Sequence, residues 1–90
     1  MNEVFGALAH PVRREILRLL RKRAMSAGEL AERFEIAKPT LSGHFAVLKN
    51  ADLVTTERNG TTIIYRLNMS VMEEAVAAFA ALAGLKGKER

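Results

Sequence analysis

The first part of the chain distributes apolar and basic residues with the period of an α-helix. A short apolar segment at residues 4–9 is followed by His10-Pro11, and proline both restricts the residue before it and suits the first turn of a helix. Residues 11–23 then place apolar side chains on one side and basic side chains on the other. The pattern predicts a short helix, a break at His10, and a longer amphipathic helix.

A second pair of helices is predicted next. Ser26 and Glu29 have the spacing of a capping box, in which each side chain bonds a free backbone N–H at the helix start. A short helix is expected from there to about Phe34. The following helix, residues 38–51, has Pro39 in its first turn and apolar residues spaced i, i+4, i+7. This apolar face, which would anchor the helix to the core, consists of Leu41, Phe45 and Leu48.

A β-hairpin is predicted after these helices. Two runs rich in threonine, isoleucine, valine and tyrosine flank Asn59-Gly60, the strongest short-range signal for a two-residue type I′ turn. Counting outward from that turn pairs Thr56 with Ile63 and Val54 with Tyr65. The hairpin is expected to occupy the region between the fourth helix and the last one.

The last helix is predicted from Val71 to Leu85. Ser70 and Glu73 have the spacing of a second capping box. The helix is apolar on nearly every side, so it must be covered on more than one side.

The predicted order of elements is α-α-α-α-β-β-α, a mainly helical domain with a small β-hairpin. Two short helices joined by a tight turn and followed at once by a hairpin are the components of a winged helix-turn-helix. Ninety residues are enough for a single domain, so residues 1–90 are expected to form one such unit.

Composition narrows the function classes. Fourteen lysines and arginines against ten acidic residues give a formal charge of +4, which favours polyanionic partners, although many small proteins are mildly basic. The absence of cysteine excludes disulfides and thiolate metal sites. No signal-peptide pattern or long apolar run is present, so a cytoplasmic protein is expected. Apolar residues make up 49% of the chain, a surplus that favours burial against another copy or another protein.

The helix at residues 38–51 is the candidate DNA-recognition helix, because the N-terminal residues of the second helix of this motif enter the major groove. Lys38 can donate to guanine or phosphate, and Thr40 offers a hydroxyl and a methyl group to base edges. Glycine at position 43 permits close approach of the backbone. An isolated serine or histidine on a helix is more often simply solvated, but the order of elements favours DNA binding. The predicted DNA-binding residues of this helix are Lys38, Pro39, Thr40, Ser42, Gly43 and His44.

Two further regions are candidates for DNA contact. Arg58 and Asn59 lie at the hairpin tip, which suits a wing that reaches a minor groove or a phosphate. Arg13 and Arg14 open the second helix, where basic side chains and free N–H groups could meet the phosphate backbone. The alternative for both regions is a solvated surface with incidental arginines.

The two ends of the chain carry the candidate dimer interface. The alternative is that the same residues complete the core of the monomer, but the all-round apolar character of the last helix favours a homodimer with two recognition helices. The predicted interface residues are Phe5, Leu8, Met72, Ala75, Val76, Phe79 and Leu82.

A search for catalytic chemistry finds none. The two histidines do not form a metal-binding motif, and no glycine-rich phosphate loop is present. Glu73-Glu74 fits the acidic preference of a helix N-terminus better than an acid/base pair. We therefore expect neither an enzyme nor a cofactor.

The sequence resembles the ArsR (SmtB/ArsR) family of winged-helix transcriptional repressors, most closely the SdpR-type autorepressors. The segments that carry the resemblance are HPVRREILRLL, MSAGELAERFEIAKPTLSGHFAVLKNADLV and ERNGTTIIYRLN. The resemblance implies a homodimer, paired through its first and last helices, that blocks transcription at a palindromic operator until a signal releases it.

Several positions depart from the family pattern. Metal-sensing members have cysteines where this chain has Ser26 and Gly28, and the last helix has no histidine, so no metal is expected. Gly43 stands where a larger, often basic residue is common. Asp52 replaces a frequent glycine and is expected to adopt the left-handed conformation, while Ala37 lacks the oxygen of a good N-cap.

Two functional hypotheses result. The first is a homodimeric, metal-independent, sequence-specific repressor that binds double-stranded DNA, acts on its own promoter, and is released by a partner protein or by autoregulation. The second is a protein-interaction module that keeps the winged-helix fold without specific DNA binding.

Overall fold

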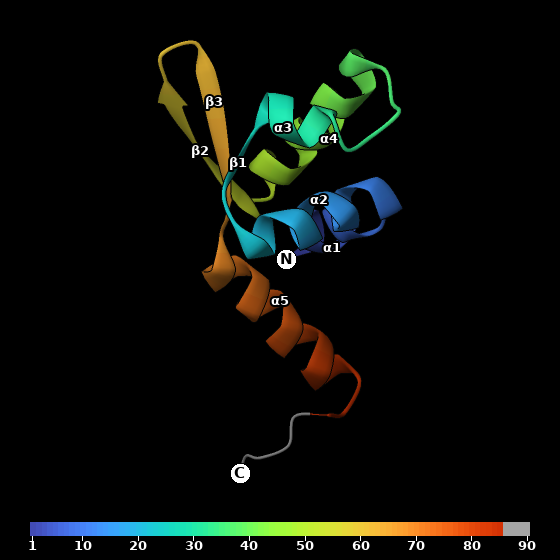
Figure 1. Ribbon diagram of the computed structural model, residues 1–90. Coiled ribbons are helices and arrows are strands. Elements are labelled where there is room, and N and C mark those ends of the chain that lie inside the picture. The colour runs from blue at the N-terminus through green and yellow to red at the C-terminus, as the bar shows by residue number, and fades with distance from the viewer. Residues whose placement is uncertain (86–90) are drawn as a thin grey trace.

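The computed structural model describes residues 1–85, and two helices open the fold (Figure 1). They are α1 (Asn2–Leu8) and α2 (Pro11–Lys22). Between them, Nδ1 of His10 accepts a hydrogen bond from the Val12 N–H at 3.1 Å, so histidine serves as the N-cap of α2 ahead of Pro11. The predicted break at His10 is confirmed.

The helix-turn-helix comprises α3 (Ala27–Ala31) and α4 (Lys38–Asn50). The capping box that was predicted at the start of α3 is confirmed. The prediction that this helix reaches Phe34 is wrong, because turn hydrogen bonds replace the helical ladder after Ala31. As predicted, Ala37 caps α4 without a side-chain bond, and Asp52 adopts the left-handed conformation with φ of 60°.

The sheet has three antiparallel strands: β1 (Met25–Ser26), β2 (Val54–Asn59) and β3 (Thr62–Leu67). Their order is β1-β3-β2, with Met25 opposite Tyr65. The element order is therefore α-α-β-α-α-β-β-α, and the sequence prediction missed β1. A strand of two residues shows no alternation of its own, and it forms only because β3 offers it an edge.

The hairpin formed by β2 and β3 is the predicted wing, but its turn is not the predicted one. Asn59 pairs with Thr62, so the two turn residues are Gly60-Thr61. Gly60 has φ of +66° and takes the first central position, as in a type II′ turn. Relative to the prediction the register moves by two residues, to pairs such as Thr56 with Tyr65. A shift of two leaves every side chain on its expected face.

The final helix, α5 (Met69–Leu82), starts from an asparagine cap. Asn68 Oδ1 accepts from the Val71 N–H at 3.4 Å, while its own N–H donates to the Leu53 carbonyl at 2.9 Å. The predicted capping box at Ser70 is therefore wrong. Asn68, directly after β3, supplies the N-cap oxygen, and the helix begins before Ser70.

The core lies where α2, α3, α4 and the sheet meet. Its largest fully buried side chains are Ile16, Leu30, Leu48 and Leu53. By contrast, α5 points away from this body (Figure 1), and of its described residues only Ala75 is buried. Ala75 belongs to the core cluster, and Val71 and Met72 pack against it, so the first turns of α5 contribute to the core while the rest of the helix extends beyond it. None of the helices within residues 1–85 is long and apolar enough to cross a membrane.

Candidate nucleic-acid interface

The front end of α4 is exposed, as a recognition helix requires. Leu41, Phe45 and Leu48 face the core as predicted, and the Phe45 ring packs on Tyr65 of β3 with centroids 4.8 Å apart. This contact fixes the helix against the wing. The exposed residues at the front are Lys38, Pro39, Thr40, Ser42 and Gly43. Their side chains and backbone are available to a ligand without any rearrangement of the fold.

His44, which the sequence places among the predicted DNA-binding residues, does not belong to this exposed set. Only 9% of its surface is accessible. It follows Leu41 by three residues and precedes Leu48 by four, which places it on the apolar face of the helix. Its Nδ1 lies 3.0 Å from Nη1 of Arg13, and its ring centroid lies 4.4 Å from that of His10. His44 therefore contacts α2 and is largely shielded from solvent.

Arg13 and Arg14, the two candidates for phosphate contact on α2, both donate hydrogen bonds to the end of α1. The Arg13 Nε–H donates to the Ala7 carbonyl at 2.7 Å, and Arg14 Nη1 donates to the Leu8 carbonyl at 2.8 Å. The last carbonyls of a helix have no partner within it, and cations are favoured beside them. The two arginines thus cap α1. Arg14 remains exposed, whereas Arg13 is half-buried.

The wing tip projects beside the recognition helix and is exposed from Arg58 to Thr62. One wing arginine, Arg66, is paired with Glu57 at 3.3 Å on the solvent side. Arg58 makes no ion pair within residues 1–85. Of these two arginines, Arg58 is the better placed to meet an external anion.

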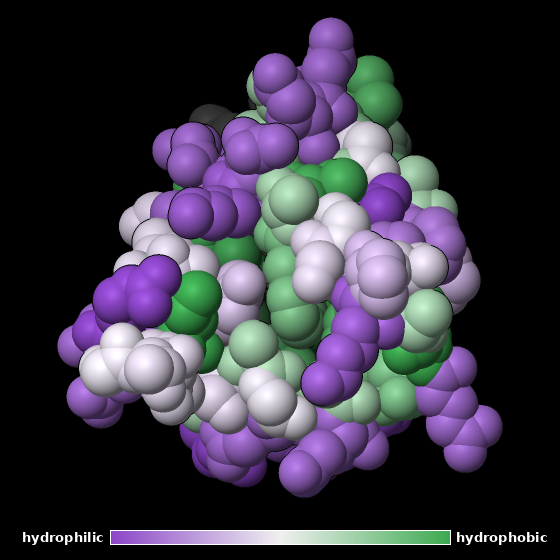
Figure 2. Space-filling view, turned by 90° about the horizontal axis from the view of Figure 1, so that it is seen from above, coloured by the Kyte–Doolittle hydropathy of each residue, from purple (hydrophilic) through white to green (hydrophobic). Residues whose placement is uncertain are grey.

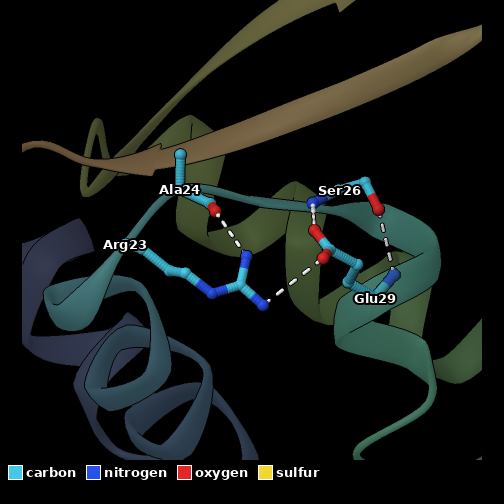
Figure 3. A network of polar contacts seen from close by, with 4 residues as sticks. All are labelled: Arg23, Ala24, Ser26 and Glu29. Atoms are coloured by element: carbon cyan, nitrogen blue, oxygen red, sulfur yellow. Dashed lines mark hydrogen bonds and ion pairs between the residues drawn. The ribbon is translucent and has the colours of Figure 1, made fainter.

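A polar network sets the position of α3 against the end of α2 (Figure 3). The Ser26 hydroxyl accepts from the Glu29 N–H at 3.0 Å, and the Glu29 carboxylate accepts from the Ser26 N–H at 2.9 Å. Arg23 donates to the same carboxylate at 3.3 Å and to the Ala24 carbonyl at 3.2 Å. The Ser26 N–H, followed by the Arg23 guanidinium, holds the pKa of Glu29 below its usual value. The first helix of the motif is thereby fixed at its N-terminus.

Figure 2 looks onto the face that carries the wing and the helix-turn-helix. Hydrophilic side chains form its rim, and less polar ones lie in a hollow between them (Figure 2). A shallow pocket between α3 and α4 contributes to this region, lined among others by Ala31, Leu41 and Phe45.

The opposite end of the molecule carries an apolar groove between α1 and α5. Val76 and Phe79 are 63% and 60% exposed, and Leu82 beyond them is 81% exposed. Ala75 forms the buried floor of the groove, so it is already covered within the protomer. The lining residues are Phe5, Leu8, Met72, Ala75, Val76 and Phe79. All six belong to the predicted dimer interface.

Comparison with known proteins identifies the family. Residues 8–57 match the family model described as a helix-turn-helix domain. The chain is 43% identical over 76 residues to the transcriptional repressor SdpR of Bacillus subtilis, covering 84% of each chain. It is 37% identical over 73 residues to an arsenical resistance operon repressor of Staphylococcus xylosus, covering 81% of this chain and 70% of the other. The chain belongs to the ArsR (SmtB/ArsR) family of winged-helix transcriptional repressors.

Solved structures agree with this membership. The crystal structure of an ArsR family transcriptional regulator matches with a TM-score of 0.85 and 26% identity, covering 99% of this chain and 92% of the other. The transcriptional repressor BigR from Xylella fastidiosa matches with a TM-score of 0.72 and 33% identity, covering 90% and 83%. The ArsR-family chain is thus a DNA-binding transcriptional regulator and not an enzyme, which confirms the function class predicted from the sequence.

Gly43 supports a first prediction about this ArsR-family protein. It lies inside α4, and apart from its chain neighbours and the backbone of its own helix, a Cβ added there would meet no atom within 4 Å. Glycine in a helix interior costs roughly 0.5–1 kcal/mol relative to alanine. Gly43→Ala is therefore expected to raise the free energy of unfolding by about that amount, measured by thermal or urea denaturation.

Ala46 of the same helix is the matched control, because it is also exposed and allows the opposite substitution, alanine to glycine. Ala46→Gly should lower the free energy of unfolding by a similar amount. If Gly43 is present so that the backbone can approach DNA, Gly43→Ala should weaken operator binding even though it stabilises the free protein. If Gly43→Ala lowered the free energy of unfolding, the prediction that a methyl group fits at this position without a clash would be wrong.

Proposed function

We propose that this ArsR-family repressor binds an inverted-repeat operator as a homodimer, without a metal. The front end of α4 enters the major groove, and the wing tip reaches the neighbouring minor groove or phosphates. The observation that carries the proposal is the exposure of Lys38, Thr40 and Ser42 on a helix whose other side is anchored in the core. Donors at the start of such a helix can contact phosphates and base edges together.

The dimer is proposed from the apolar groove between α1 and α5. Soluble monomers rarely expose a large contiguous apolar patch, and this patch contains two side chains, Val76 and Phe79, that are more than half exposed. A two-fold axis through the patch would pair it with the same patch on a second copy. Two recognition helices would then face two half-sites on one side of the duplex.

Metal independence is proposed from the residues available. Among residues 1–85 no group of three histidine, cysteine, aspartate or glutamate side chains is close enough to bind a metal ion. The chain has no cysteine, and thiolates are common ligands for soft metals. We place the repressor in the cytoplasm with its operator in its own promoter, following the resemblance to SdpR-type autorepressors, and we expect it to be released by a partner protein or by autoregulation.

The test is a footprint on the DNA upstream of the gene, followed by affinity measurements on the protected duplex. Protection of an inverted repeat at low salt is expected, with log affinity falling against log salt at a slope of about −0.9 per neutralised phosphate. Lys38→Ala and Thr40→Ala should reduce the preference for that duplex over unrelated DNA. Arg58→Ala should weaken both duplexes alike.

Lys49→Ala is the matched control, because Lys49 is an exposed lysine in the last turn of the same helix. It removes the same charge but lies about 16 Å along the helix axis from Lys38, at about 1.5 Å per residue. Its specificity should stay near that of the wild type. Equal operator binding by a Lys38, Thr40 and Arg58 triple alanine variant would exclude the proposed interface. Absence of any protected repeat would favour a protein-interaction module instead.

A further inference from the structure

One arginine side chain joins three helices of the molecule. Arg13 lies in the first turn of α2 and uses all three of its nitrogen atoms. Nε donates to the Ala7 carbonyl at 2.7 Å, Nη2 donates to the Gly6 carbonyl at 3.2 Å, and Nη1 lies 3.0 Å from Nδ1 of His44. Two of these contacts are to α1 and the third is to α4. No shorter side chain, and no side chain with a single donor group, can make them together.

The contact between Arg13 and His44 has a defined polarity. A guanidinium can only donate, so Nδ1 of His44 must accept and the ring proton must be on Nε2. Burial lowers the pKa of His44 below its usual value, and nearby His10 and Arg13 lower it further. The ring of His10 is fixed in turn, because its Nδ1 accepts from the Val12 N–H. The neutral imidazole of His44 is thus held as a hydrogen-bond acceptor at neutral pH.

The hydrogen-bond partners of Arg13 lie beside the apolar groove and in the middle of the recognition helix. Gly6 and Ala7 lie between Phe5 and Leu8, which line the apolar groove. His44 lies between the exposed front of α4 and its anchored end. Arg13 therefore contacts the helix of the proposed dimer interface and the recognition helix at the same time.

We propose that Arg13 and His44 form a positioning link that fixes the recognition helix relative to α1, and thereby sets the half-site spacing that the dimer accepts. The inference rests on the proposed function, because spacing has meaning only for a dimer on an inverted repeat. Half-sites read by such a dimer lie about 34–36 Å apart, or a multiple of this. A small tilt of α4 in each protomer changes the distance between the two recognition helices, and each added base pair also rotates one half-site around the duplex.

The test is Arg13→Lys, which keeps the positive charge but replaces three directed donors with one ammonium group. Its probe is a duplex selected by the wild-type protein from a random library, together with versions whose spacer is longer or shorter by one and two base pairs. The wild type should prefer one spacing. In Arg13→Lys, the ratio of affinities for the preferred and the altered spacings should be about tenfold smaller, the size expected for one charge-assisted hydrogen bond. The salt slope should stay unchanged, because Arg13 neutralises no phosphate in this arrangement.

Three comparisons make the result specific. Arg14→Lys is the matched control, since Arg14 caps the same helix but does not touch α4, and it should keep the spacing preference. His44→Asn retains an acceptor at the same bond distance from Cα and should also keep it, whereas His44→Leu should lose it as Arg13→Lys does. Thermal melts show that each variant is folded at the temperature of the assay, and the His44 pair carries the test alone if Arg13→Lys is not.

Two results would overturn the link. In the first, Arg13→Lys and His44→Leu keep the wild-type spacing preference. In the second, Arg13→Ala reduces the salt slope by about one while Arg13→Lys binds like the wild type, which would make Arg13 a phosphate contact. Failure of the proposed function itself looks different, because the wild type would then select no duplex with two half-sites.

Discussion

Replacing Phe79 with glutamate is expected to produce a monomer and to lower operator affinity by on the order of a hundredfold or more. Phe79 is 60% exposed in the protomer and lines the groove between α1 and α5, so the change costs the isolated fold little. In the proposed dimer the same position is buried, where an unpaired carboxylate is strongly unfavourable. A monomer also loses the gain from binding two half-sites at once, which commonly amounts to two to four orders of magnitude.

Light scattering and sedimentation would give the oligomeric state, and fluorescence anisotropy on the operator duplex would give the affinity. Ala81→Glu is the matched control, because Ala81 is exposed on the same helix but does not line the groove. It adds the same charge and should leave both measurements close to the wild type. If the Phe79→Glu protein remained dimeric, the dimer interface would lie elsewhere. If the wild type were monomeric at high micromolar concentration, the proposed dimer would be excluded.

Local sequence signals predicted most of the fold correctly. The break at His10-Pro11, the capping box at Ser26 and the left-handed Asp52 each depend on a few neighbouring residues. The physical cause lies within one helical turn in each case, so it can be read without knowledge of the tertiary structure. The apolar face of the recognition helix was equally clear, because a period of 3.6 residues is visible over thirteen residues.

What could not be predicted depends on contacts between distant segments. The two-residue strand β1 exists only because β3 offers it an edge, and the hairpin register is set by the whole wing and not by the Asn59-Gly60 signal alone. His44 was misplaced because histidine is polar. Its spacing from Leu41 and Leu48 already indicated the buried face, but its partner Arg13 is 31 positions away in the sequence.

The exposed front of α4 was easier to predict than the orientation of the arginines. Exposure follows from the helical period, which assigns Thr40 and Ser42 to the side opposite the core. Whether an arginine points to solvent or to the end of another helix depends on where that helix ends. Arg13 and Arg14 donate to the last carbonyls of α1, so part of the basic side of α2 stabilises the end of a neighbouring helix.

Leu48→Ala is expected to lower the free energy of unfolding by about 2–5 kcal/mol, the range for removing a fully buried leucine side chain. Leu48 is 0% exposed on the core-facing side of α4, and its carbonyl accepts the Leu53 N–H at 3.0 Å where the chain turns toward β2. A domain of this size has only about 5–15 kcal/mol in total. The melting temperature should therefore fall by roughly 10 °C or more, measured at a fixed protomer concentration because association also stabilises the fold.

The neighbouring Val47 supplies the matched control for this loss. It is partly exposed on the other side of the same helix, so Val47→Ala should change stability by no more than about 0.5 kcal/mol. Well below its melting temperature, Leu48→Ala should still prefer the operator over unrelated DNA, because Lys38 and Thr40 are unchanged. A loss of preference in the folded variant, with stability little changed, would mean that Leu48 shapes DNA recognition directly instead of anchoring the helix that performs it.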